Sequence, residues 1–394
     1  MKRAIIIILD GIGVGAAADA AAFASVGANS LGNVLAQTKV ALPNLGRLGL
    51  GNIIPLASVA AVDKPAAAYG RLAPQSSGMD TISGHWEIAG LVLPKPLPTF
   101  AEGFPAEIIA AFTQITGRGV LGNCVASGTE IINRLGPAQM TSGQWIVYTS
   151  ADSVFQVAAH EDIIPLAELY EACSAARELL QGEYAVGRVI ARPYLGQPGN
   201  FWRTANRRDY ALLPPANGLL ARASQAGLPV ISVGKVDDIF AADSISHKIA
   251  AANNAASKAG ILQALQEAEQ GLIFSNLIDF DALYGHRNDI IGYAQALADF
   301  DAWLPQLLSK LKPADLLFIT ADHGNDPTMP GTDHNRENVP LLVYGAAIKP
   351  GNLGLRSSFA DLGATIAAYL GLHPLPAGQS FLPQLGINTN QVLR

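Results

Sequence analysis

The residues in this sequence that could most readily do chemistry are an adjacent aspartate and histidine, Asp322 and His323, with a second histidine, His334, soon after them. Carboxylate and neutral imidazole groups together are typical ligands of divalent zinc, manganese or iron. None of these candidate ligands is a cysteine, which argues against a structural zinc site. An isolated Asp-His pair can equally be an ordinary solvated turn, so the interpretation depends on what accompanies it.

Three more residues of the same types lie elsewhere in the chain: Asp10, Asp281 and His286. The six side chains together exceed what a single catalytic ion binds while it keeps an open coordination position. Two ions roughly 3.5–4 Å apart would use all of them, and such a pair holds the attacking and leaving oxygens of phosphoryl transfer. The sequence therefore predicts a two-metal site.

The segments that precede these residues have the composition of buried strands. Residues 316–320 and 339–344 are short apolar runs bounded by turn residues. Residues 4–9 are an unbroken branched-aliphatic run, which suits a central parallel strand buried on both faces. Ligands of open α/β sheets bind at the carboxyl ends of the strands, so Asp10 and Asp322 stand where functional residues are expected. The glycines after Asp10 do not match the G-x-G-x-x-G dinucleotide fingerprint.

The carboxyl-terminal half alternates between strand-like and helix-like segments. Residues 228–233 and 271–278 are strand-like, and residues 251–270 are helix-like. Apolar side chains at steps of three and four predict a further helix with one face in the core: Tyr293, Leu297, Phe300, Leu304 and Leu307. This alternation predicts an α/β fold in which helices flank a mostly parallel sheet.

A hydroxyl that could act as a nucleophile stands in the segment D-T-I-S-G-H-W-E, where Thr81 follows Asp80 at the start of a plausible helix. Threonine and aspartate are ordinary helix N-caps, so either residue can have a purely structural role. The N-terminus of a helix is also where backbone N–H groups and the helix dipole stabilise a phosphoryl group. This segment alone leaves both interpretations of Thr81 open.

At 394 residues the chain is longer than a single hydrophobic core usually supports, so two domains are expected. Two proline-rich segments, residues 93–98 and 212–218, have the composition of hinges around an inserted domain. We therefore predict a core domain of residues 1–97 and 218–394, and an inserted cap domain of residues 98–217.

Within the insert, residues 145–149 and 184–190 are strand-like and residues 166–180 are helix-like, which predicts a smaller α/β domain. The insert also carries charged residues that could meet a substrate: Asp152, Arg188, Arg192, Arg203, Arg207 and Arg208. Most surface arginines only solvate the protein, but these arginines cluster near the end of the insert.

The composition is that of a well-packed globular chain, with 49% apolar and 15% charged residues. The net charge of −6 contains no block of like charges, so we expect neither nucleic acid nor membrane as partner. The two cysteines, Cys124 and Cys173, are too few for a disulfide framework. The apolar run before Asp10 is shorter than a signal peptide requires. We therefore expect a cytoplasmic protein.

Several of these motifs together resemble those of the phosphopentomutases, a family of the alkaline phosphatase superfamily. The similar segments in the predicted core are Asp10, D-T-I-S-G-H-W-E with Thr81, D-F-D-A-L-Y-G-H ending at His286, A-D-H-G-N-D and G-T-D-H. Those in the insert are A-S-G-T-E-I, Y-T-S-A-D-S-V and G-R-V-I-A-R-P. The resemblance spans essentially the whole chain, and it implies an alkaline-phosphatase-like core with an inserted smaller α/β cap.

The resemblance also implies an activity and its cofactors. Members of the family interconvert α-D-ribose 1-phosphate, or 2-deoxyribose 1-phosphate, and the 5-phosphate, with two Mn²⁺ ions and a sugar bisphosphate as activator. By the family pattern Thr81 is the phosphorylated nucleophile. One ion is held by Asp10, Asp322 and His323, and the other by Asp281, His286 and His334.

The predicted substrate-binding residues are Asp152, Arg188, Arg203 and Lys235. Two divalent ions would bring a charge of about +4, against about −3 from the three aspartates and about −2 from a threonine phosphate. The site would therefore remain negative before a sugar phosphate arrives, and the arginines with Lys235 would offset that charge.

Two alternatives belong to other classes. One is a phosphatase or a phosphoglycerate-mutase-like enzyme with the same two-metal site; the latter typically carries a serine nucleophile, where this chain has Thr81. The other is a metal-binding or storage protein of the same fold, which would be expected to lack the nucleophile.

Overall fold

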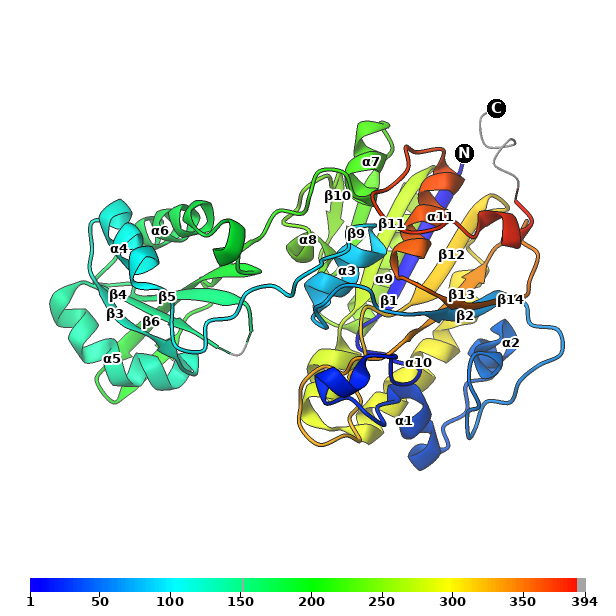
Figure 1. The fold of residues 1–394 in the computed structure, drawn as a ribbon, viewed down its shortest axis with the longest axis horizontal. Helices are drawn as coiled ribbons and strands as arrows, with labels where there is room; N and C mark the ends of the chain where they lie inside the picture. Colours follow the sequence, from blue (N-terminus) through cyan, green and yellow to red (C-terminus); the bar gives the residue numbers. More distant parts are fainter. Residues whose placement is uncertain (151, 388–394) are drawn as a thin grey trace. The chain divides into compact units, whose positions relative to one another are not determined.

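The computed structural model describes residues 1–150 and 152–387, and the chain divides into two compact units (Figure 1). Unit 1 consists of Met1–Pro96 and the chain from Pro214 onward, and unit 2 is Leu97–Leu213. Unit 2 is therefore inserted between two parts of unit 1 along the sequence, and its limits lie close to residues 98–217.

Unit 1 is built on an eight-stranded sheet with the strand order β10-β9-β11-β1-β12-β13-β2-β14. In that order the strands are His247–Ile249, Val230–Val233, Gly271–Leu277, Arg3–Leu9, Asp315–Thr320, Val339–Tyr344, Ala68–Leu72 and Asn352–Arg356. Only β13 pairs antiparallel with its neighbours in this sheet; the other pairings are parallel. The predicted mostly parallel α/β sheet is confirmed.

The centre of the sheet is formed by β11, β1 and β12, which are buried along their whole lengths. Their branched and aromatic side chains suit strands that are covered on both faces. Leu9 pairs with Leu277, and Ile8 pairs with Thr320. The three strands therefore end at nearly the same level, and the loops that follow them start from one edge of the sheet.

Helices flank this sheet (Figure 1). They are α1 Ser30–Thr38, α2 Pro43–Leu48, α3 Thr81–Ile88, α7 Leu219–Gln225, α8 Val236–Ile239, α9 Asn254–Glu267, α10 Ile290–Leu308 and α11 Ala360–Leu370. α1 and α2 pack against α10, whereas α3 and α7 pack against α11. All five apolar residues predicted to form the inner face of α10 are buried.

Unit 2 has its own sheet, in the order β3-β4-β5-β6-β7, and β8 also pairs with β6. The strands are Val120–Val125, Trp145–Thr149, Val154–His160, Arg188–Gln197, Asn200–Arg203 and Arg208–Ala211. Its helices are α4 Ala106–Thr116, α5 Gly128–Ser142 and α6 Leu166–Leu179. α4 and α6 share one hydrophobic core with the sheet, and α5 contributes to a second.

The strand predicted at residues 184–190 is wrong in its limits. Gly182–Tyr184 is a 3-10 turn, and β6 runs from Arg188 to Gln197, through Pro193. Proline lacks an N–H and is therefore usually confined to strand ends, edge strands or bulges. However, β6 pairs with β8 before Pro193 and with β7 after it, so the missing donor falls where the partner strand changes.

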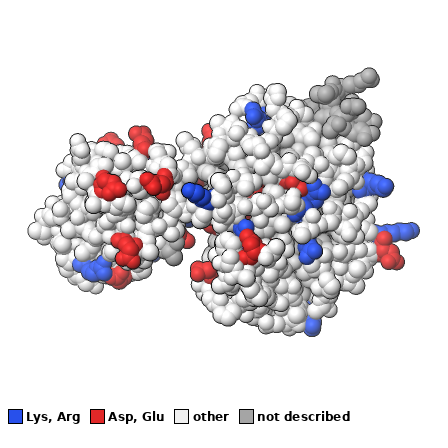
Figure 2. Space-filling view, viewed as in Figure 1, with Lys and Arg blue, Asp and Glu red and all other residues white. Residues whose placement is uncertain are grey.

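On the face drawn in Figure 2, charged side chains are scattered and most of the surface carries neither acidic nor basic groups. Cys124 and Cys173 are both free thiols. Among the described residues, no helix combines the length and apolar character needed to cross a membrane.

Candidate metal centre

Three aspartates lie just beyond the central strands of unit 1. Asp10 follows β1 directly, Asp322 comes shortly after β12, and Asp281 lies in the short helical turn Phe280–Tyr284 after β11. Because these strands are adjacent and parallel, their carboxyl ends meet at one edge, where loops can bring side chains together. The site is therefore placed by strand register and built by loops on a rigid base.

The first group of candidate ligands is Asp10, Asp322 and His323, all of them buried. His323 Nε2 lies 3.3 Å from Asp10 Oδ1 and 3.4 Å from Asp322 Oδ2. The backbone N–H of Gly11 donates to Asp322 Oδ1 over 3.3 Å. One ligand atom from each of the three residues falls within 4.8 Å of the others, so the group could hold one ion.

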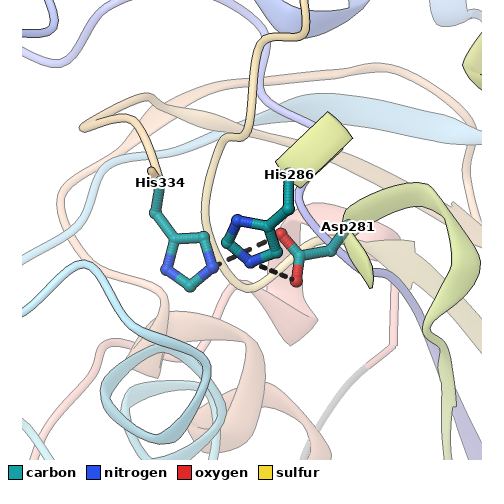
Figure 3. A group of neighbouring side chains, drawn as sticks. All are labelled: Asp281, His286 and His334. Carbon is teal, nitrogen blue, oxygen red and sulfur yellow. Dashed lines mark ion pairs between the residues drawn. The ribbon is translucent and has the colours of Figure 1, made fainter. Parts of the chain in front are cut away.

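The second group is Asp281, His286 and His334 (Figure 3). Both imidazoles point at the same carboxylate: His286 Nε2 lies 3.2 Å from Asp281 Oδ2, and His334 Nε2 lies 3.3 Å from Asp281 Oδ1. The other ring nitrogen of His286, Nδ1, donates to the carbonyl of Thr332. Such a bond fixes the tautomer and leaves Nε2 free for a metal.

The two groups adjoin through their histidines. The rings of His323 and His334 stack with centroids 3.8 Å apart, and those of His286 and His334 lie 4.9 Å apart. All six residues predicted as ligands are thus gathered in one place.

Thr81 is the first residue of α3, and the cap of this helix is its neighbour. Asp80 accepts hydrogen bonds from the backbone N–H of Ser83 over 3.1 Å and from its hydroxyl over 2.6 Å. The Thr81 hydroxyl instead lies 3.3 Å from His323 Nε2. Of the two roles that the sequence left open, the cap therefore belongs to Asp80.

Three residues that hold the aspartates were missed by the sequence analysis. Asn276 donates to Asp10 Oδ2 over 2.9 Å, and Asn325 donates to Asp281 Oδ1 over 2.7 Å. His85 Nδ1 lies 3.1 Å from Asp322 Oδ2 and 2.9 Å from the Thr81 carbonyl. Two features of the sequence could have indicated these roles. Asn276 is near the carboxyl end of a central strand, and His85 lies one helical turn after Thr81.

The pKa values in the first group of ligands are shifted because its carboxylates are buried and close together. Burial and the charges of Asp322 and Asp281 raise the pKa of Asp10. Burial would raise the pKa of Asp322, but His323 and His85 hold it at about 2. Burial would lower the pKa of His323, whereas the surrounding aspartates raise it to about 10. Carboxylates this close oppose one another's ionisation unless cations compensate them.

Unpartnered buried atoms test whether a metal fits. Among the described residues, Asp10 Oδ1, Asp322 Oδ2 and His334 Nε2 are buried and make no hydrogen bond, although each has a polar atom of another site residue 3.1–3.3 Å away. Buried polar atoms are normally hydrogen-bonded, and these three belong to the side chains that converge on the site. Oxygen and imidazole nitrogen are suitable donors for divalent ions. The residues therefore fit divalent metal ions.

The other predicted site residues lie in both units. In unit 1, half-buried Lys235 follows the end of β9. In unit 2, Arg188 on β6 lies 3.7 Å from Asp209, Arg203 ends β7 with an exposed side chain, and Asp152 is exposed before β5. Arg188 and Arg203 stand on strands of the same sheet.

Comparisons with known proteins define the class. Residues 2–374 match the family model of the metalloenzyme superfamily. A phosphopentomutase of Desulfitobacterium hafniense is 54% identical over 387 residues, covering 98% of this chain and 100% of that protein. A phosphopentomutase of Caldanaerobacter subterraneus subsp. tengcongensis is 54% identical over 98% of each chain. The solved alkaline phosphatase of the Antarctic bacterium TAB5 aligns with a TM-score of 0.40 and 12% identity, over 94% of this chain and 98% of its own.

This chain therefore belongs to the phosphopentomutase family of the metalloenzyme superfamily, and it is an enzyme, a phosphotransferase mutase of the isomerase class.

Proposed function

We propose that the enzyme interconverts α-D-ribose 1-phosphate, or 2-deoxyribose 1-phosphate, and the corresponding 5-phosphate. The observation that carries this proposal is the position of the Thr81 hydroxyl, 3.3 Å from His323 Nε2 in the first group of candidate ligands. A nucleophile beside such a site suits phosphoryl transfer through the protein. The names of the two relatives support a pentose phosphate as substrate.

The ligand assignment follows the two groups. Asp10, Asp322 and His323 would hold one ion, and Asp281, His286 and His334 would hold the other, with Mn²⁺ as the expected metal and other divalent ions possible. When bound, the two ions would supply positive charge that stabilises phosphoryl oxygens and lowers the pKa of a nearby hydroxyl. Asn276 and Asn325 would keep the aspartates in place.

In the proposed cycle, Thr81 carries the phosphoryl group as phosphothreonine. Transfer of that group to the free hydroxyl of the sugar monophosphate breaks the Thr81 Oγ1–P bond and gives a sugar bisphosphate. Return of the other phosphoryl group to Thr81 restores the phosphoenzyme and releases the isomeric monophosphate. A small amount of sugar bisphosphate would therefore activate an enzyme that has lost its phosphate. The N-terminus of α3 would stabilise the negative charge of the phosphoryl group on Thr81, because its N–H groups and the helix dipole lie beside this residue.

The proposed substrate-binding residues are Asp152, Arg188 and Arg203 of unit 2 and Lys235 of unit 1. The three basic side chains would offset the negative charge of the substrate's phosphate groups, and Asp152 would accept hydrogen bonds from sugar hydroxyls. A bisphosphate has a second phosphate that the metal groups do not hold, and an arginine can bind it with two parallel hydrogen bonds.

The proposal is tested by phosphorus NMR of ribose 1-phosphate incubated with the purified enzyme, Mn²⁺ and catalytic sugar bisphosphate. The expected result is a signal of ribose 5-phosphate without accumulation of inorganic phosphate. Release of inorganic phosphate as the main product would identify a phosphatase instead. An unchanged spectrum with ribose and deoxyribose phosphates alike would contradict the pentose assignment.

A further inference from the structure

Buried Arg336 holds the stretch of chain that leads into the helix of Thr81. Arg336 is 3% exposed, and its guanidinium donates to three main-chain carbonyls of that stretch. Nη1 lies 2.6 Å from the Ser76 carbonyl oxygen and 2.8 Å from that of Gly78, and Nη2 lies 3.3 Å from that of Pro74. Thr81, the first residue of α3, comes only three residues after Gly78. One side chain therefore fixes the chain just before the proposed nucleophile.

A carboxylate binds N–H groups of the same segment, residues 74–78. Glu87, in the last turn of α3, is buried and accepts from the N–H of Gln75 over 2.9 Å and from that of Ser76 over 2.6 Å. It also accepts from the Ser358 hydroxyl over 2.8 Å. Hydrogen bonds in which one partner is ionised are stronger than neutral ones. The segment is therefore tied by its carbonyls to a guanidinium and by its N–H groups to a carboxylate.

The guanidinium of Arg336 is itself held in one orientation. Its Nε lies 3.1 Å and its Nη2 3.0 Å from the Asp19 carboxylate, and its central carbon lies 4.7 Å from the centroid of the Phe23 ring. The backbone N–H of Arg336 donates to the Ser25 hydroxyl over 2.9 Å. A planar guanidinium with partners on its face and its edges is pre-organised, so it gives the segment a fixed point of attachment.

Arg336 also belongs to the loop that carries a candidate metal ligand, because it stands two residues after His334. The helix of the nucleophile packs closely on a second ligand loop. A Cβ placed on Gly84 of α3 would clash with the carbonyl oxygen of Asp322, so the approach requires glycine. The position of α3 against the metal centre is therefore closely defined, and Arg336 links the segment before α3 to the loop of His334.

We propose that Arg336 is a positioning residue for phosphoryl transfer to and from Thr81. The inference rests on the proposed function, in which the Thr81 hydroxyl accepts and returns the phosphoryl group. The reacting oxygen and phosphorus must approach in a defined geometry, and a displacement of about 1 Å caused by a distant substitution can cost about 100-fold in rate. Loss of the bonds between Arg336 and segment 74–78 allows such a displacement, although Arg336 touches no reacting atom.

The test uses the full-length enzyme with Mn²⁺ and the variant Arg336→Lys. Lysine keeps a positive charge beside Asp19, but its compact ammonium cannot reproduce the fork that binds the carbonyls. The rate of Thr81 phosphorylation by sugar bisphosphate, measured in a single turnover with quenching and phosphopeptide mapping, should fall about 100-fold. The content of bound metal and the dissociation constant for ribose 5-phosphate should equal those of wild type, because Arg336 belongs to neither group of candidate ligands.

Arg3→Lys is the matched control. Arg3 is also buried, donates to the Leu265 carbonyl over 2.6 Å and the Ala268 carbonyl over 2.9 Å, and pairs with buried Asp315. It begins β1, at the opposite end of this strand from the metal centre. The melting temperature of Arg3→Lys should fall at least as far as that of Arg336→Lys, because both partners of its ion pair are buried. Its rate of Thr81 phosphorylation should remain that of wild type, so loss of stability alone does not explain a slow Arg336→Lys.

A second variant keeps the inference testable if Arg336→Lys does not fold. Asp19→Asn leaves the carbonyl bonds of Arg336 but removes the charge that orients it, at a side chain that is 48% exposed. It should slow the same step to a smaller extent, and a wild-type rate would overturn the inference. So would wild-type phosphorylation of Arg336→Lys, or a loss of bound metal that accounts for its slower rate. A wild-type enzyme that acquires no phosphate on Thr81 contradicts the proposed function itself.

Discussion

The imidazole rings of His323 and His334 stack with their centroids 3.8 Å apart and their planes inclined by 28°. His323 belongs to the group of Asp10 and Asp322, and His334 belongs to the group of Asp281 and His286. The two groups of candidate ligands therefore form a single cluster. A centre with two neighbouring metal ions requires such an arrangement.

Substitution at each side of this contact should remove different ions. We expect Asp322→Ala and His334→Ala each to bind about one divalent ion fewer than wild type, and to lose mutase turnover, because each residue belongs to a separate group. Metal analysis of the purified variants with parallel circular dichroism is the measurement. Two tightly bound ions in both variants would contradict the assignment. His373→Ala, a histidine outside both groups, is the control and should retain both ions.

Metal loading should also stabilise the folded chain. A ligand that binds only the folded state adds about 2.7 kcal/mol at a concentration 100-fold above its dissociation constant. Relief of repulsion among buried Asp10, Asp281 and Asp322 acts in the same direction. We predict that Mn²⁺ raises the melting temperature in a concentration-dependent way and that chelation reverses it. A melting temperature that is equal with chelator and with Mn²⁺ would show that these carboxylates bind no metal in the folded state.

Much of the candidate site could be predicted from sequence because its ligands directly follow apolar runs. Asp10 and Asp322 could be predicted for two reasons. A continuous buried strand can be recognised from its composition, and functional side chains often follow the carboxyl ends of parallel strands. That Asp10 and Asp322 meet depends on the pairing of β1 with β12, which residue spacing alone does not determine.

Other features depend on contacts that span the chain. His85 meets Asp322, and Asn276 meets Asp10, across more than 200 residues. Sequence patterns alone do not distinguish such asparagines and histidines from ordinary polar residues. The predicted limits of β6 were wrong because the strand continues through Pro193, where its partner changes from β8 to β7, and this pairing is not visible in the sequence.

The roles of Thr81 and Asp80 should separate in stability and activity. Thr81→Ala should abolish turnover but change the free energy of unfolding by no more than about 0.5 kcal/mol, since Thr81 is not the cap. Asp80→Ala should cost about 1 kcal/mol as the loss of a helix cap. Thr81→Ser keeps a hydroxyl and should retain some activity. Phosphopeptide mapping after incubation with sugar bisphosphate should find the label on Thr81; label on another residue would refute the nucleophile.

Arg203 should control the retention of the bisphosphate. Loss of one charge-assisted contact of about 1.5–3 kcal/mol should reduce kcat/KM roughly 10- to 150-fold. Arg203→Ala should still accept phosphate on Thr81, but it should release bisphosphate and inorganic phosphate during turnover. Phosphoenzyme yield and released products are measured together, with Arg134→Ala, an exposed arginine of α5, as control. If Arg203→Ala turned over at the wild-type rate and released neither bisphosphate nor inorganic phosphate, Arg203 would have no role beyond solvating the surface.

Glu337 should make stability depend on pH. Its side chain is 1% exposed and accepts hydrogen bonds from the Ser30 N–H over 3.0 Å, the Ser30 hydroxyl over 2.5 Å and the Gly15 N–H over 3.2 Å. Burial, with a smaller contribution from the charge of Asp326, raises its pKa from 4.5 to about 7 despite those bonds. Burial, followed by the charge of Glu337, raises the pKa of buried Tyr293.

The folded protein thus binds this proton more tightly than the unfolded chain does. The stabilisation is fully present below about pH 4.5 and is lost as the pH rises through about 7. We predict that wild type loses about 2–3 kcal/mol between pH 5 and pH 8 relative to Glu337→Gln, whose side chain stays neutral. The measurement is denaturant unfolding of both proteins across this pH range at constant Mn²⁺. The difference between their free energies of unfolding removes the contribution of all titrating groups that the two proteins share. Ser30→Ala removes a donor that favours the ionised carboxylate, so it should move the loss to higher pH. A wild-type and Glu337→Gln difference that is flat from pH 5 to pH 8 would show that Glu337 ionises normally in the folded enzyme.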